Sequence, residues 1–185
     1  IKIQTVLPLR SSASIKAILA NNFNLSRLLI IKGFDINSQT ENNFSPLIYA
    51  VQSGQKKIVK LLLKHGADPS TMTNEGLNAL HYAAKNPNGA KIIELLIKHI
   101  HIEQKSGRTP TGDKLTALHL AAAANNIACV KKLLELGADP FQQTTTGQRA
   151  SSLTTNPAIK EILLQSEQMK ELEQEFRTAP SAYRF

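Results

Sequence analysis

Residues 45–69, SPLIYAVQSGQKKIVKLLLKHGADP, determine the fold of this chain, because much of the remaining sequence consists of imperfect copies of them. Ser45 is a good helix N-cap, and Pro46 suits the first helical position, where no backbone N–H is needed. A short helix therefore begins there and ends near Gly54. A second helix follows, with aliphatic residues at spacings of three and four. Gly66 ends it, since glycine adopts the left-handed conformation without penalty.

Copies of this unit recur at a nearly constant spacing. Gly33 and Gly66 are 33 residues apart, as are Ser45 and Asn78, whereas Asn78 and Thr116 are 38 apart. The copies of the first half read Ser45-Pro46-Leu47-Ile48-Tyr49-Ala50, Asn78-Ala79-Leu80-His81-Tyr82-Ala83 and Thr116-Ala117-Leu118-His119-Leu120-Ala121, and those of the last read Gly66-Ala67-Asp68 and Gly137-Ala138-Asp139. A period of this length indicates an array of stacked repeats.

These motifs resemble the ankyrin repeat, whose signature is TPLHxA followed by an IVxLLL helix and GAD. The resemblance implies an all-α solenoid of about five helix-turn-helix repeats with short β-hairpin-like fingers. We expect an ankyrin-repeat domain over residues 1–165 and a C-terminal helix extension and tail over residues 166–185. Its expected parts are a degenerate N-terminal repeat at 11–36, repeats at 37–69, 70–103 and 104–140, and a truncated C-terminal repeat at 141–165.

Composition and charge restrict the classes of function. The formal net charge is +8, which raises nucleic acid or an anionic surface as partners. The lysines, however, fall on the outward side of the second helices, and no aromatic residues that could stack on bases lie among them. No run approaches the roughly 18 to 20 apolar residues that span a bilayer, and no signal peptide is evident. We therefore expect a cytoplasmic chain that has no transmembrane segment and does not bind nucleic acid. Binding to an anionic surface is an alternative.

Motifs for catalysis are missing from the sequence. It has no P-loop, no GxSxG, no paired CxxC and no HExxH, so neither an enzyme nor a cofactor is predicted. His99, His101 and Glu103 are the only metal candidates, and an irregular helix end is the alternative interpretation. Cys129 falls at a core position of a second helix, where a buried thiol is expected.

The third repeat departs from the pattern in two places. Residues 86–89 add one residue between its helices, and Ile100-His101-Ile102 replaces Gly-Ala-Asp. Without a glycine there, we expect the helix to end in a different backbone conformation. The following finger, residues 103–114, is four residues longer than its counterparts. It is either a binding loop or a neutral insertion in a tolerant turn.

The resemblance implies that His81 and His119 hydrogen-bond backbone between neighbouring repeats, and that partners bind on the concave surface formed by finger tips and first helices. Phe44, Leu77 and Leu115 share one offset, and they form either a row of apolar anchors or contacts with the next finger. The predicted partner-binding residues are Glu41, Asn42, Phe44, Gln52, Asn74, Glu75, Leu77, Lys85, Arg108, Asp113 and Leu115.

The predicted function is therefore a monomeric, non-enzymatic module that binds another protein. A first alternative is the targeting or regulatory part of a larger enzyme. The richness in Lys, Asn, Ile and Leu, together with a Glu-rich stretch at 167–175 near the C-terminus, also resembles effectors that intracellular bacteria deliver into eukaryotic hosts. For the helix itself, an ordinary amphipathic capping helix followed by a frayed tail is the preferred interpretation.

Overall fold

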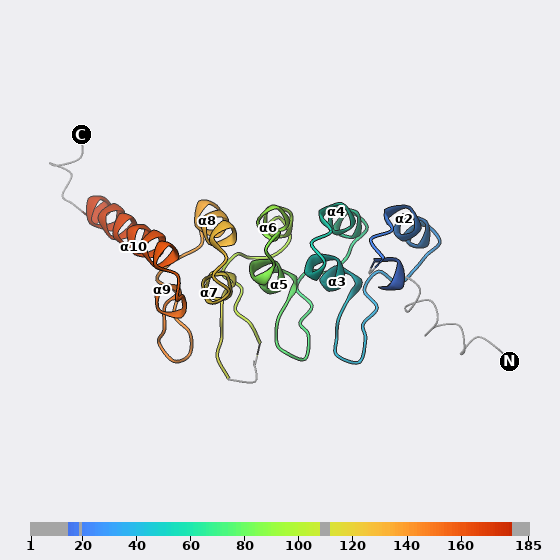
Figure 1. Cartoon of the computed structure of the whole chain (residues 1–185), viewed down its shortest axis with the longest axis horizontal. Helices are drawn as coiled ribbons and strands as arrows, with labels where there is room; N and C mark the ends of the chain where they lie inside the picture. Colours follow the sequence, from blue (N-terminus) through green and yellow to red (C-terminus); the bar gives the residue numbers. More distant parts are fainter. Residues whose placement is uncertain (1–14, 19, 108–111, 179–185) are drawn as a thin grey trace.

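The computed structural model describes residues 15–18, 20–107 and 112–178. Figure 1 shows helix pairs standing side by side in one row, with loops projecting on one side. The helices are α2 (Phe23–Ile31), α3 (Pro46–Gln52), α4 (Lys56–Lys64), α5 (Ala79–Lys85), α6 (Ala90–Leu96), α7 (Ala117–Ala123), α8 (Ile127–Glu135), α9 (Ala150–Leu153) and α10 (Pro157–Thr178). Residues 15–18 are also helical. The predicted all-α repeat solenoid is confirmed.

The helix pairs are related to the predicted repeats in a simple way. Residues 15–18 and α2 lie within 11–36, α3 and α4 within 37–69, α5 and α6 within 70–103, and α7 and α8 within 104–140. The last repeat holds α9 and the first part of α10. The predicted end of the repeat domain, residue 165, thus falls inside a continuous helix.

The residues that were predicted to begin and end the helices of the second repeat have the expected hydrogen bonds and backbone conformations. The Ser45 hydroxyl accepts a hydrogen bond from the Ile48 N–H at 3.3 Å, and Pro46 occupies the first turn of α3. Gly54 and Gly66 follow the two helices with φ of 68° and 88°, a region that favours glycine. The two helices are therefore short and are followed by glycines, as the sequence predicts.

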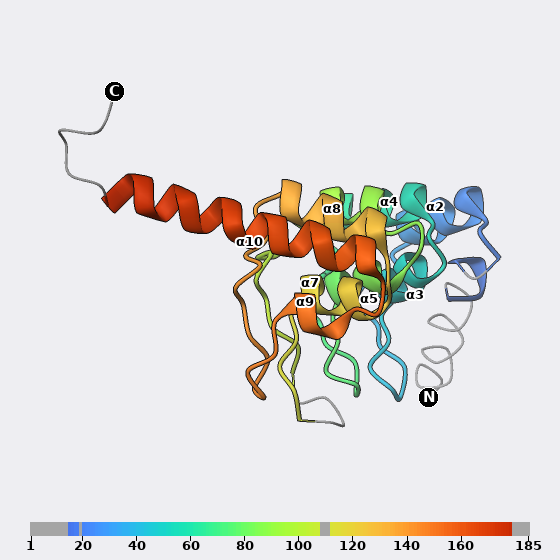
Figure 2. The ribbon, with the colours of Figure 1, turned by 60° about the vertical axis from the view of Figure 1, so that its left-hand side comes forward.

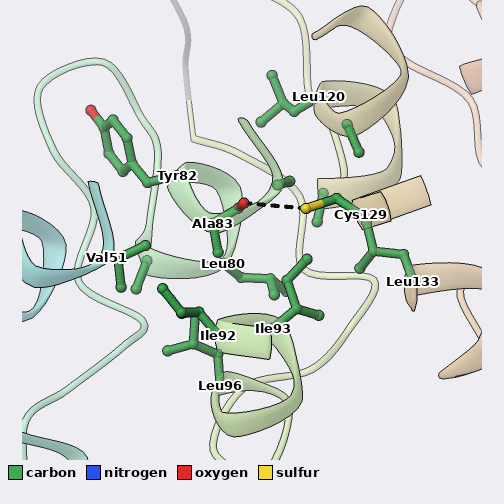
Figure 3. Packing of buried hydrophobic residues seen from close by; sticks show 14 of the residues in the cluster. Val51, Leu80, Tyr82, Ala83, Ile92, Ile93, Leu96, Leu120, Cys129 and Leu133 are labelled. Carbon is green, nitrogen blue, oxygen red and sulfur yellow. Dashed lines mark hydrogen bonds between the residues drawn. The ribbon is translucent and has the colours of Figure 1, made fainter. Parts of the chain in front are cut away.

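The core runs along the row between first and second helices. Ala50, Ala83 and Ala121 are completely buried, and such small residues let neighbouring first helices approach closely. Cys129 is also completely buried, and its Sγ lies 3.6 Å from the Ala83 carbonyl oxygen (Figure 3). Burial raises the pKa of this thiol to about 11. The expected structural role of Cys129 is confirmed.

The third repeat accommodates its extra residue with a side-chain bridge. The Asn86 amide donates to the carbonyl oxygens of Val51 at 3.0 Å and Gln52 at 2.7 Å, which links α5 to the preceding repeat. Gly89 is required, because a Cβ atom there would overlap the Ala83 carbonyl.

The second helix of the third repeat ends without a glycine. Helix α6 finishes at Leu96, and none of residues 97–102 has a positive φ. The prediction of a different backbone ending is confirmed.

Helix α10 is the longest described element, and it extends well past the helix pairs (Figure 2). Its first turns pack against the core through Ile159 and Leu163, which are both completely buried. Further along, the Glu167 carboxylate accepts hydrogen bonds from Arg149 Nη1 at 2.8 Å and Ser151 Oγ at 2.9 Å. The docked part of α10 thus continues beyond residue 165. The predicted tail lies outside the described residues after Thr178.

Candidate protein-binding surface

The fingers are four loops that share one backbone pattern. In each, an N–H near the start donates to a carbonyl just before the next helix, which closes a hairpin-like turn. These bonds join Thr40 to Phe44 at 3.1 Å, Thr73 to Leu77 at 2.9 Å, Ser106 to Leu115 at 2.7 Å and Thr144 to Gln148 at 2.9 Å. Asn43 takes the tip conformation at φ 60°, where two other fingers have glycine, and asparagine tolerates this region.

Neighbouring fingers are hydrogen-bonded to each other. The Asn74 N–H donates to the Asn42 carbonyl at 3.2 Å, and the Gly107 N–H donates to the Gly76 carbonyl at 2.7 Å. Between the last two fingers, Thr145 Oγ1 donates to Asp113 Oδ1 at 2.8 Å. The finger surface, by which we mean residues 39–44, 72–77, 104–107, 112–115 and 143–148 with the exposed side of the first helices, is thus cross-linked along its length.

His81 holds the base of the fingers in place. Its Nδ1 accepts from the Asn78 N–H at 3.2 Å, so Nε2 carries the proton and donates to the carbonyls of Gln104 and Leu115, both at 3.1 Å. Burial lowers the pKa of His81 to about 4, because the charged form would lose its hydration. The neutral ring therefore ties one repeat to the next finger.

His119 repeats this arrangement one unit later. Its Nδ1 accepts from the Thr116 N–H at 3.2 Å, and its Nε2 lies 3.2 Å from the Gln148 carbonyl oxygen. Burial also lowers the pKa of His119. The expectation that both histidines bond backbone between repeats is confirmed.

Most of the predicted partner-binding residues lie on the finger surface with accessible side chains. Asp113 is half-buried. Those that are exposed are Glu41, Asn42, Gln52, Asn74, Glu75 and Lys85. Arg108 lies outside the described residues. The structure thus places polar groups from two successive repeats, and one from a third, on the same surface.

The predicted row of three apolar anchors loses Leu77, which the structure buries. Leu77 is only 5% exposed and belongs to the core, while Leu115 is half-buried against it. Phe44 is half-buried too, and its ring packs against Tyr49 at 5.4 Å and Tyr82 at 5.6 Å between centroids. These three residues turn inward where their fingers close onto the core, whereas Gln148, at the same place in the last finger, is exposed. Burial therefore removes Leu77 from the row, while Phe44 and Leu115 stay partly accessible. The alternative, contacts with the next finger, stays a prediction.

Tyr49 is a residue of this surface that sequence reasoning missed. It lies on α3, is half-buried, and has its ring beside that of Phe44. Its position in the TPLHxA motif is occupied by Tyr82 and Leu120 in later repeats, which are both buried. The sequence therefore gave no signal that this copy alone is partly accessible.

The metal candidates are used in the structure for other contacts. The His101 Nδ1 accepts from the Glu103 N–H at 3.2 Å, and the Glu103 carboxylate accepts from the Asp139 N–H at 2.7 Å. Within the described ranges, no group of three or more His, Cys, Asp or Glu side chains is arranged to hold a metal ion. Glu103 instead joins the third repeat to the fourth.

The opposite side of the solenoid is basic. Exposed lysines follow the second helices, namely Lys56, Lys57, Lys60, Lys64, Lys91, Lys98 and Lys131. Lys60, Lys64 and Lys98 line a shallow groove between α4 and α6 whose apolar floor is Leu63 and Leu95. Among the helices that the structure describes, none is both long and apolar enough to cross a membrane.

Several known proteins are similar to this chain in sequence. Its 31% identity to the palmitoyltransferase AKR1 of Lachancea kluyveri extends over 72% of the chain and 22% of that protein. It is 34% identical to the nuclear factor NF-kappa-B p105 subunit of Gallus gallus, over 64% of the chain and 12% of that protein. It is 25% identical to the mitochondrial disaggregase of Bos taurus, over 95% of the chain and 26% of that protein. The chain thus spans about a quarter or less of these relatives.

A family model described as ankyrin repeats (3 copies) matches residues 14–106 and 70–144. The matched residues include the helix pairs from α2 to α8 and the fingers between them. The chain therefore belongs to the ankyrin-repeat family.

Proposed function

We propose that this chain binds a partner protein through its finger surface. The observation that carries the proposal is the row of hydrogen bonds between neighbouring fingers, from Asn74 to Asn42, Gly107 to Gly76 and Thr145 to Asp113. A surface that is already rigid loses little conformational entropy when it binds, so more of its contact energy contributes to affinity.

The side chains on this surface suit a polar partner with one apolar contact. Glu41, Gln52 and Lys85 are exposed and supply charge and hydrogen-bonding groups. The accessible edges of Phe44 and Tyr49 lie between them in the repeat array. Aromatic residues surrounded by polar ones are typical of binding hot spots.

The proposal is tested by capture from a eukaryotic cell lysate with two triple variants. The first, Glu41→Arg with Gln52→Arg and Lys85→Glu, changes charges on the finger surface. The control, Lys57→Glu with Lys60→Glu and Lys131→Glu, changes charges on the outer helices. All six side chains are exposed, so both variants should keep the helicity of the unmodified chain.

We expect at least one protein to be retained by the unmodified chain and by the outer-helix variant, and lost by the finger-surface variant. Loss with the outer-helix variant alone, together with a steep decrease in binding as salt rises, would support the anionic-surface alternative instead. Equal capture by all three chains would contradict the finger surface as the binding site.

A second candidate function is favoured by the relatives. Palmitoyltransferases of Lachancea kluyveri and Homo sapiens match the chain over only 22% and 26% of their own lengths. We propose, as the alternative, that this ankyrin array is the targeting or regulatory part of a longer enzyme. Expression of the complete reading frame would test this alternative. A product with no folded domain besides the ankyrin array would contradict a role as part of a longer enzyme.

Delivery into a eukaryotic host cell is a narrower form of the first proposal. It rests on the glutamate-rich stretch 167–175, whose residues lie on α10. A reporter enzyme fused to the N-terminus of the chain would measure delivery during infection. Delivery that persists after the residues following Gln165 are deleted would contradict a signal in this helix.

A further inference from the structure

Helix α2 stands at one end of the row of helix pairs (Figure 1). Several of its apolar side chains are exposed. Phe23 is 37% exposed, Leu25 41% and Leu28 51%. Leucine side chains in contact with water forgo the stabilisation that burial gives the same residue type elsewhere in the array.

The repeat register identifies which neighbour normally covers these positions. Leu25 corresponds to Ile58, which lies 33 residues later, and to Cys129, which lies a further 71 residues along the chain. Ile58 is 1% exposed and Cys129 is 0% exposed. Cys129 is covered by the preceding repeat, since its Sγ lies against the Ala83 carbonyl (Figure 3). By the same register Leu28 corresponds to Lys132, whose Nζ lies 2.9 Å from Oε1 of Glu94 in the preceding repeat.

Asn22 gives a second, independent indication. It caps α2, and its Oδ1 accepts from the Leu25 N–H at 3.0 Å. Asn126 caps α8 in the same way, accepting from the Cys129 N–H at 3.2 Å, with φ and ψ of −93° and 85° against −88° and 90° for Asn22. The two asparagines therefore occupy the same conformation in their repeats.

The amide nitrogens of these capping residues differ in what they contact. Asn126 Nδ2 donates to the carbonyls of Ala84 at 3.2 Å and Asn86 at 2.7 Å, at the end of the preceding first helix. Gln55 Nε2, in the corresponding place, donates to the Ile18 carbonyl at 2.6 Å. Asn22 Nδ2 has no acceptor within the part of the chain that the structure describes. By the repeat register, a preceding repeat would present such carbonyls beside Asn22.

The opposite end of the array also exposes apolar side chains. On α10, Leu164 is 43% exposed, Met169 59%, and Leu172 and Phe176 60% each. Exposed apolar residues alone therefore do not distinguish the α2 end. Its distinguishing features are that Leu25 stands at a position that a preceding repeat covers elsewhere in the array, and that Asn22 has the conformation of the capping Asn126, which bonds to such a repeat.

We propose that the face of α2 formed by Asn22, Leu25 and Leu28, the α2 end face, is a repeat-to-repeat interface. Its occupant is the helix pair of a further ankyrin-type repeat on the N-terminal side of α2. Small apolar residues of the occupant's first helix cover the two leucines, and carbonyls at the end of that helix accept from Asn22 Nδ2. This surface is separate from the finger surface, and the proposal does not depend on partner binding there.

The test adds such a repeat in register and measures hydrogen exchange of α2. A copy of residues 34–66 is joined directly ahead of Ile1, which lies 33 positions before Phe34, so the repeat spacing is preserved. We expect the amides of α2 to exchange about tenfold more slowly in the extended chain, because a covered helix opens less often. Mass spectrometry of peptides from residues 23–31 gives the rates.

Leu25→Lys provides the matched control in both chains. In the unmodified chain Leu25 is 41% exposed, so the substitution should change α2 exchange little. In the extended chain it places a charge at the position that is 1% exposed in Ile58 and 0% in Cys129, so it should remove the added protection. Equal α2 exchange with and without the added repeat would overturn the proposal. So would an added repeat that stays unfolded, since the same residues fold when stacked at positions 34–66.

Sedimentation of the unmodified chain tests whether a second copy of the chain, and not a further repeat, covers the α2 end face. A concentration-dependent dimer that Leu25→Lys abolishes would mean that a second copy covers the α2 end face, and would overturn the assignment to a further repeat. A monomer at all concentrations is the result we expect.

Discussion

At the residue scale, burial keeps the His81 ring neutral in the folded chain. Burial lowers its pKa to about 4 from an ordinary 6.5, so the unfolded chain binds the proton more tightly than the folded one. The contribution of His81 to stability is therefore fully present above about pH 6.5 and is lost as pH falls towards 4. His119, whose pKa is also lowered, acts in the same direction.

We expect the free energy of unfolding to decrease by about 2 kcal/mol from His81 alone between pH 7 and pH 5. His81→Gln should be less stable at pH 7 but should lose less stability on acidification by about that amount. Urea unfolding followed by circular dichroism at both pH values measures the difference. An unchanged pH dependence in the variant would show that His81 does not titrate as described.

Cys129 offers a second test of burial. Because the thiol is completely buried and its pKa is raised to about 11, little thiolate is present or accessible at neutral pH. We expect alkylation by iodoacetamide to be at least about a hundredfold slower in the folded chain than in urea. Mass spectrometry of the labelled chain follows the rate, and labelling at the unfolded rate in native buffer would contradict the packing of α8 against α5.

Leu77 shows where the sequence misled. Its place in a finger, beside polar residues, indicated an exposed anchor, yet it is 5% exposed because the finger closes onto the core there. We expect Leu77→Ala to reduce the free energy of unfolding by about 2 to 4 kcal/mol. Gln52→Ala on the exposed side of α3 is the control and should stay within about 0.5 kcal/mol. A neutral Leu77→Ala would restore the anchor interpretation.

At the element scale, a buried carboxylate adds to the apolar contacts that dock α10. Glu167 is 7% exposed and accepts from Arg149 and from the buried hydroxyl of Ser151. Glu167→Ala leaves that hydroxyl without its acceptor, and we expect a loss of about 1 to 3 kcal/mol. Glu171→Ala, an exposed position on the same helix, should be nearly neutral. Denaturant midpoints compare the two, and equal effects would mean that the pair does not dock α10.

The sequence predicted the helix pairs well because their signals are local. Caps such as Ser45 and glycines such as Gly66 specify where each element begins and ends, and the structure follows them. The docking of α10 could not be foreseen, since Arg149 and Glu167 are 18 residues apart and nothing in either residue marks its partner. Spacing also could not show that Asn86 would bridge to the preceding repeat.

At the scale of the whole molecule, the row of repeats separates two surfaces of different chemistry. One carries the hydrogen-bonded fingers with exposed Glu41, Asn74 and Lys85, and the other carries the lysines of the second helices. Which surface is used could not be read from composition, because the net charge of +8 reflects mainly the outer helices. Residue offsets alone placed most candidate side chains on the finger surface but could not separate accessible from buried ones.

The most direct test of the central claim is the hydrogen-exchange footprint of the captured partner on this chain. We expect binding to slow exchange in the fingers, residues 39–44, 72–77 and 104–107, and to leave the outer helices α4, α6 and α8 unchanged. The finger-surface variant should show no such slowing at the same concentrations. Protection confined to α4, α6 and α8, with fingers unaffected, would contradict the account and assign binding to the lysine-bearing side.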